Sequence, residues 1–328
     1  MTLTMRAATL AAPGEIVVGH FPRPAPQAGD VLVRMEHASI CGSDVHVVFD
    51  GFQRPEMVGR PGYPGHEGVG VVVESLDPAF APGTPVLTVP PGAQGQCFAE
   101  FQVVPGTYLV PLPDGADLRR MLMAQQVGTT LFAMRRIGRP PGDVAVVIGA
   151  GSAGTYFVQH LRRAGYASVI VSDPNAQRLA TAAALGATHP VLVPQESLEQ
   201  TVHEVTGGQG ADLVIEAAGY DDCRNAAIEL VRWQGTVCFF GYPERAGLAP
   251  YPSFLAFRRC VTIAWINGAQ AEPELLSFRE AVQLIDDRTI EVDHCLERML
   301  PLEQAADALD LARRAGGGAT KVGIDIAS

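Results

Sequence analysis

Residues 144–173 read VAVVIGAGSAGTYFVQHLRRAGYASVIVSD, and the architecture of the chain follows from their pattern. The opening VAVVI is apolar and rich in valine, which predicts a buried strand. Gly149, Gly151 and Gly154 then form a GxGxxG motif, and a segment with helical periodicity follows. In this context the first glycine makes the turn, the second lets the backbone approach a pyrophosphate, and the third packs the helix on the strand. The stretch therefore predicts a dinucleotide site with phosphate at the helix N-terminus, rather than a simple glycine-rich turn.

The second strand of this unit ends in an acid, about twenty residues after the glycines. This acid, Asp173, can accept hydrogen bonds from both ribose hydroxyls of NAD, and it would repel the 2′-phosphate of NADP. Arg178 follows in the next helical segment, where it either lies against the adenosine end or is a solvated helix position. The sequence thus favours NAD as the cofactor.

Strand and helix patterns keep alternating as far as residue 266. Successive right-handed βαβ units make a doubly wound parallel sheet with helices on both faces. The expected fold class is therefore α/β, with a cofactor domain over residues 126–266. Residues 1–125 differ, because they contain short β-prone runs between turns rich in Gly and Pro. That pattern predicts a small, irregular β-rich domain.

The β-rich part contains a candidate metal site. Cys41, His66 and Glu67 supply a thiolate, an imidazole and a carboxylate, the side chains that zinc takes in catalytic sites with a fourth position left open. A loop must fold Cys41 back beside the His-Glu pair, and Gly42 and Gly65 give the backbone room to do so. The interpretation without a metal is a small buried cysteine and a solvated His-Glu pair.

CGSDVH (41–46) and GHEGVG (65–70), together with the glycine motif, resemble the zinc-dependent medium-chain alcohol and polyol dehydrogenases. The resemblance extends over nearly all of the chain. It implies a GroES-like catalytic domain formed by residues 1–125 and 267–328, and a Rossmann domain over 126–266. The implied enzyme contains zinc and depends on NAD.

The resemblance also implies separate catalytic roles for the metal, the cofactor and the nearby side chains. The metal polarises the substrate alcohol oxygen and the cofactor takes the hydride. Ser43 and His46 lie where the family relays the proton to solvent, although a turn residue and a solvated loop histidine are the alternatives. Asp44 is expected to orient His66 through its other ring nitrogen, or else to cap a helix.

Two departures from the family pattern concern metal binding. Where relatives have a cysteine-rich lobe with a second zinc, this chain has only PPGAQGQC, and a single cysteine, Cys97, cannot make a four-ligand site. We therefore expect one zinc per chain. Near the start of the segment that enters the cofactor domain, where relatives often have a further ligand, stands Gln125. Its amide either touches the metal weakly or faces the cleft.

Composition narrows the class of partner. The net charge of -11 argues against nucleic acid and anionic membranes, which leaves a small molecule as the expected partner. The six cysteines are scattered, as is typical of reduced thiols. No apolar run approaches the length of about 18 residues that a membrane span needs, and the first residues lack the pattern of a signal peptide. The expected location is the cytoplasm.

The expected reaction interconverts a secondary alcohol of polyol, sugar or cyclitol type and its ketone. The gap of 25 residues between Cys41 and His66 resembles the sorbitol branch, and a longer loop gives a wider cleft. Residues 47–49, an apolar Val-Val-Phe, could instead line an apolar cleft or belong to the core. The alternatives in function are a zinc-free quinone or enone reductase of the same superfamily and a non-catalytic NAD-binding protein. VTIAWI (261–266) resembles the strand through which relatives pair, so we expect a homodimer.

Overall fold

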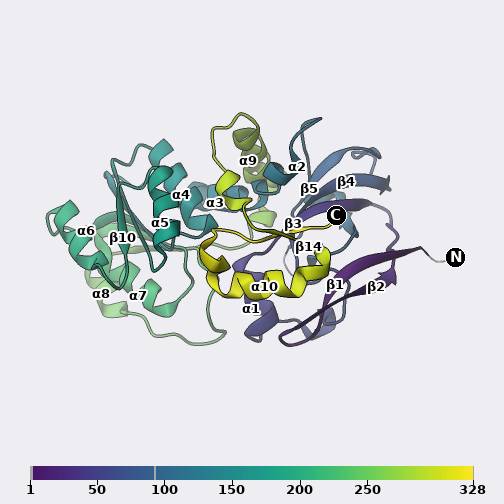
Figure 1. Ribbon diagram of the computed structural model, residues 1–328. Coiled ribbons are helices and arrows are strands. Elements are labelled where there is room, and N and C mark those ends of the chain that lie inside the picture. Colours follow the sequence, from purple (N-terminus) through teal and green to yellow (C-terminus); the bar gives the residue numbers. More distant parts are fainter. Residues whose placement is uncertain (1–2, 92–93, 328) are drawn as a thin grey trace. The chain divides into compact units, whose positions relative to one another are not determined.

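The computed structural model describes residues 3–91 and 94–327 (Figure 1). The chain forms two compact units. Unit 1 comprises Met1–Gly128 and Gly268–Ser328, and unit 2 comprises Thr129–Asn267. The C-terminal tail therefore belongs to the same unit as the first 128 residues.

A seven-stranded mixed sheet forms the centre of unit 1. Its order is β14-β15-β3-β4-β5-β7, and β6 pairs with β3 off this path. Only β14 and β15 run parallel; the other neighbours are antiparallel. The strands are β3 (Asp30–Ser39), β4 (Glu67–Ser75), β5 (Pro85–Thr88), β6 (Phe101–Pro105), β7 (Leu109–Pro111), β14 (Met299–Pro301) and β15 (Gly323–Asp325).

Two further strands, β1 (Thr4–Ala12) and β2 (Glu15–Pro22), form an antiparallel pair beside this sheet. The sequence pattern does not predict β1, because alanine has little β propensity. Pairing with β2 and a bridge from Ala7 to Ala99 hold it extended. Tertiary context thus overrides local propensity at the N-terminal strand.

The hydrophobic core of unit 1 contains side chains from both the N-terminal and the C-terminal parts of the chain. Helix α1 (Gly42–Phe49) and helix α10 (Ala305–Arg313) both pack on it. Val48 is fully buried, and Val47 and Phe49 pack against the same cluster. The apolar run 47–49 therefore belongs to the core. The other α-helices that begin in unit 1 are α2 (Leu118–Met121), α3 (Ala124–Ile137) and α9 (Leu276–Asp286).

Unit 2 contains a six-stranded parallel sheet of order β10-β9-β8-β11-β12-β13. The chain runs outward from β8 to β10, crosses over, and runs outward again from β11 to β13. This order is that of a doubly wound dinucleotide-binding fold, whose ligands bind at the carboxyl ends where the strand order reverses. The strands are β8 (Val144–Ile148), β9 (Ser168–Asp173), β10 (His189–Leu192), β11 (Ala211–Glu216), β12 (Val231–Phe239) and β13 (Thr262–Trp265).

The central strands of unit 2 are buried on both sides, as their continuous apolar runs predict. Two separate core clusters, each containing side chains from β8, β9 and β11, lie under the helices. These helices are α4 (Ser152–Arg163), α5 (Ala176–Ala184), α6 (Leu198–Thr206), α7 (Asp221–Leu230) and α8 (Ser253–Arg258). The expected fold class, an α/β chain with a β-rich domain and a doubly wound sheet, is confirmed.

No helix within the described ranges combines the length and the apolar character that crossing a membrane requires.

Candidate active site

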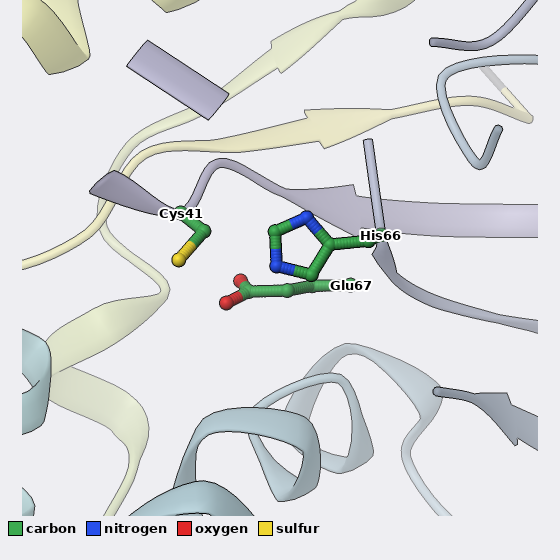
Figure 2. Close-up of side chains that lie close together, drawn as sticks. All are labelled: Cys41, His66 and Glu67. Atoms are coloured by element: carbon green, nitrogen blue, oxygen red, sulfur yellow. The ribbon is translucent and has the colours of Figure 1, made fainter. Parts of the chain in front are cut away.

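Cys41, His66 and Glu67 converge in unit 1. Cys41 follows β3 and caps the N-terminus of α1, whereas Glu67 is the first residue of β4. Because β3 and β4 are antiparallel neighbours and Ser39 pairs with Glu67, the ends of the 25-residue loop meet. Possible ligand atoms of the three side chains all lie within 4.8 Å of one another. The sulfur, the imidazole and the carboxylate turn toward a common space (Figure 2).

This cluster stands out in the chain. Over residues 3–91 and 94–327, no other group of three or more His, Cys, Asp or Glu side chains is close enough to hold a metal ion. His66 and Glu67 are 8% and 1% exposed, so water does not screen them as it screens acidic groups on a surface. The set of donors fits zinc, which takes sulfur, imidazole nitrogen and carboxylate oxygen.

Asp44 connects two of the three candidate ligands. One carboxylate oxygen accepts the backbone N–H of Cys41 at 2.9 Å, and the other lies 2.9 Å from Nδ1 of His66. Nδ1 is thereby engaged, which leaves Nε2 for a metal. Burial lowers the pKa of His66, but the charge and hydrogen bond of Asp44 outweigh it and raise that pKa well above its ordinary value. Asp44 thus serves both as part of the helix cap and as the partner of His66.

Glu67 has a partner that the sequence analysis missed. Nζ of Lys321 lies 2.6 Å from Oε2 of Glu67, and the hydroxyl of Ser39 donates to the same oxygen. Both charged side chains are almost fully buried. Burial raises the pKa of Glu67, but Lys321 outweighs it and holds that pKa below its ordinary value. Glu67 is therefore an ionised carboxylate, with Oε1 not taken up by this ion pair.

Cys97 and Gln125 are the two other residues with a possible bearing on metal binding. Cys97 is fully buried outside the cluster, and its thiol donates to the carbonyl of Glu67 at 3.3 Å. Burial raises the pKa of this thiol well above its ordinary value, as expected for a core cysteine. Gln125 is 2% exposed near the start of α3. A part for Gln125 in metal binding stays a prediction.

The two residues expected to relay protons lie on α1. Ser43 is half-buried near the start of the helix. Nδ1 of His46 lies 2.8 Å from a carboxylate oxygen of Asp50, and its ring meets Phe52 edge-on with centroids 5.6 Å apart. His46 is therefore held by neighbours but remains partly exposed. The relay itself stays a prediction.

The glycines of the GxGxxG motif occupy three different environments in unit 2. Gly149 has φ of +100°, a conformation that other residues rarely adopt. A Cβ on Gly151, the N-cap of α4, would meet nothing within 4 Å. A Cβ on Gly154 would lie 1.9 Å from the carbonyl oxygen of Gly149. These environments correspond to the turn, the open approach and the close helix packing of a nucleotide site.

Asp173 ends β9 and lies beside the glycine turn. Its carboxylate accepts the N–H of Ala150 and the N–H of Asn175, each at 2.8 Å. Because each carboxylate oxygen has a second lone pair, the group can still accept hydrogen bonds from a ribose. Arg178 lies in the first turn of α5, where its N–H donates to the side chain of Asn175 at 3.0 Å. Contacts of Asp173 and Arg178 with a cofactor stay predictions.

Two family models match the chain. Residues 27–114 match the alcohol dehydrogenase GroES-like domain, and residues 153–285 match the zinc-binding dehydrogenases. This chain belongs to the zinc-binding medium-chain dehydrogenases. The family expected from CGSDVH and GHEGVG is thus confirmed. Its members are zinc-dependent oxidoreductases that act on small molecules with NAD(P) as the cofactor.

The relatives of this zinc-type dehydrogenase are distant but of full length. L-threonine 3-dehydrogenase of Bacillus velezensis is 26% identical, over 90% of this chain and 91% of the relative. Sorbitol dehydrogenase of Gallus gallus is 26% identical, over 93% and 92%. A zinc-binding dehydrogenase of Sinorhizobium meliloti, solved bound to NADP, is 25% identical with a TM-score of 0.85, over 99% of this chain and 100% of that one.

Proposed function

We propose that this dehydrogenase interconverts a secondary alcohol of polyol, sugar or cyclitol type and its ketone, with one catalytic zinc per chain and NAD. The observation that supports it most is the convergence of Cys41, His66 and Glu67. Similarity to sorbitol dehydrogenase supports the substrate class. The burial of residues 47–49 in the core weakens the competing idea of an apolar cleft.

The residues of the site have distinct tasks in this proposal. Cys41, Nε2 of His66 and Glu67 would hold zinc, and Asp44 fixes the ring of His66. Lys321 balances the buried charge of Glu67. When bound, zinc would supply a Lewis acid for the alcohol oxygen, and the nicotinamide an acceptor for hydride. Ser43 and His46 would pass the released proton to solvent, and Asp50, 2.8 Å from Nδ1 of His46, would hold the imidazole ring in place.

Substrate class is tested with a vicinal diol and its deoxy analogue of the same chain length. A site that hydrogen-bonds a second hydroxyl leaves buried polar groups unpaired with the mono-alcohol. We expect kcat/KM with NAD to be about 5- to 150-fold higher for the diol, since one unpaired group costs about 1–3 kcal/mol. Equal values, or a preference for the deoxy compound, would show that loop length is a poor guide to substrate.

Cofactor choice is tested at Asp173. Replacing Asp173 with Ser removes the charge that would face a 2′-phosphate, so kcat/KM should shift from NAD toward NADP, by about tenfold or more for one lost ionic repulsion. Asp143→Ser is the matched control, because that exposed carboxylate lies at the opposite end of the sheet, just before β8. The relative from Sinorhizobium meliloti was solved bound to NADP. If the native chain also gives the higher kcat/KM with NADP, this role of Asp173 is contradicted.

We also propose a homodimer built on the edge strand β13. Trp265 on this strand is 63% exposed, and Phe254 and Phe257 on the preceding α8 are 75% and 77% exposed. An open strand edge with apolar neighbours favours pairing with a second copy. Light scattering should give twice the chain mass, and Trp265→Asp should shift it toward the monomer. A native chain that is monomeric at micromolar concentration would count against the dimer.

A further inference from the structure

Residues 94–98, which we call the 94–98 segment, pack directly on the backbone that carries two of the candidate zinc ligands. Within it, the N–H of Phe98 donates to the carbonyl of Gly62 at 3.2 Å. The ring of Phe98 leaves no room at Gly65, because a Cβ there would lie 2.4 Å from it. The 94–98 segment therefore confines the turn that leads into His66.

Cys97 binds the backbone on both sides of His66. Its N–H donates to the carbonyl of Gly65 at 3.0 Å, and its thiol donates to the carbonyl of Glu67 at 3.3 Å. One residue thus engages the peptide group just before His66 and the peptide group just after Glu67, which flank the two candidate ligands. Cys97 is fully buried, so water does not compete for these hydrogen bonds.

Gly95, near the start of the 94–98 segment, also packs closely against Gly65 and His66. A Cβ at this position would lie 2.5 Å from the carbonyl oxygen of Gly65 and 2.5 Å from Cβ of His66. The distance to Cα of His66 would be 2.8 Å. Two of these three atoms belong to the backbone, which cannot move aside as a flexible side chain can. Any larger residue at position 95 must displace His66.

We infer that Gly95 and Cys97 are positioning residues that hold His66 and Glu67 in the geometry needed for zinc. Neither residue would touch metal, substrate or cofactor; both act through the ligand backbone. The reason is that a metal site needs its ligands within roughly 0.5 Å of the productive geometry. This inference rests on the proposed zinc site, and it assigns a task to a segment whose one cysteine cannot make a four-ligand zinc site of its own.

The first test compares Gly95→Ala with Gly19→Ala. Gly19 lies on β2 of the same unit, and a Cβ there would meet only the ring of Phe21 at an ordinary 3.5 Å. Zinc release from the loaded proteins to a chromogenic chelator is followed by absorbance. We expect release about tenfold or more faster from Gly95→Ala, the usual effect of disturbing the surroundings of metal ligands. Release from Gly19→Ala should stay within about twofold of the native chain.

Cobalt substitution adds a spectroscopic readout to this comparison. Co(II) in place of zinc reports the arrangement of its ligands through its visible absorption, so Gly95→Ala should alter the spectrum and Gly19→Ala should not. If the native chain binds no zinc, both the proposed function and the inference fail. If the native chain binds zinc and the two variants release it equally, only the inference is overturned.

A second pair of variants decides the matter if Gly95→Ala does not fold. Cys97→Ala removes the thiol donor and keeps the backbone N–H, and we expect zinc release about fivefold faster, as the loss of one hydrogen bond would give. Cys97→Ser restores a donor and should recover part of that difference. Release from Cys97→Ala at the native rate would overturn the positioning role.

Discussion

Cys41→Ala is expected to purify with little or no zinc and to lose at least about a thousandfold in kcat/KM for every alcohol, because several kcal/mol of charge stabilisation disappear with the metal. Cys41 is the one sulfur donor of the cluster, and zinc held by His66 and Glu67 alone would lack a third protein ligand. Elemental analysis and the formation of NADH at 340 nm measure the two effects. His66→Ala should behave in the same way.

Cys260→Ala is the matched control for this variant. Cys260 is an exposed free thiol on unit 2, outside the cluster, so its removal should change neither zinc content nor rate. Full activity in a zinc-free Cys41→Ala protein would contradict the zinc mechanism. It would then favour the alternative of a zinc-free reductase within the same superfamily.

Lys321→Met is expected to destabilise the metal-free protein by about 3–5 kcal/mol, since it leaves the ionised Glu67 buried without its cation. The side chains of Lys321 and Glu67 are 3% and 2% exposed, so water cannot replace the lost partner. Urea unfolding after removal of the metal measures this loss. The double variant Lys321→Met with Glu67→Gln should recover most of it, because no unpaired charge remains.

Arg314→Met controls for the loss of a positive charge on the surface. Arg314 pairs with Asp310, but their side chains are 70% and 48% exposed, so little change in stability is expected. A loss in Lys321→Met no larger than in Arg314→Met would contradict the account of the buried pair. So would an unchanged loss in the double variant.

The buried pair also predicts how stability depends on pH. The pKa of Glu67 is lowered from 4.5 and that of Lys321 is raised from 10.5. The stability that Glu67 contributes is fully present above pH 4.5, and it is lost as the pH falls through the lowered pKa of Glu67 in the folded state. The stability that Lys321 contributes is fully present below pH 10.5, and it is lost as the pH rises through the raised pKa of Lys321 in the folded state. Lys321→Met should therefore lose most, relative to the native chain, between these two limits.

The sequence was most informative where function limits the residue types. The positions of Gly149 and Gly154 admit no side chain, because one needs a left-handed backbone and the other touches a carbonyl. Such constraints leave a motif that can be read from the sequence alone. The candidate ligands were found for a similar reason, since Cys, His and Glu are chemically distinctive and their spacing resembles a family pattern.

The supporting contacts could not be predicted in the same way. Lys321 is a single lysine in the C-terminal run ATKVGIDI, and it reaches Glu67 only because β15 pairs with β3 and β3 pairs with β4. A lysine in such an apolar run is a sign of a buried partner, but nothing local to the sequence names that partner. Cys97 was expected only not to form a second zinc site, and its hydrogen bonds on either side of the His66-Glu67 pair depend on long-range packing. Residues 47–49 remained ambiguous until their packing with α10 was known.

X-ray absorption at the zinc edge of the purified native chain identifies the atoms that bind the metal. We expect one zinc per chain with a single sulfur neighbour at about 2.3 Å and nitrogen or oxygen neighbours at about 2.0–2.2 Å, as Cys41, His66 and Glu67 would give. The absence of zinc from protein that oxidises alcohols would contradict it, and so would two or more sulfur neighbours per zinc.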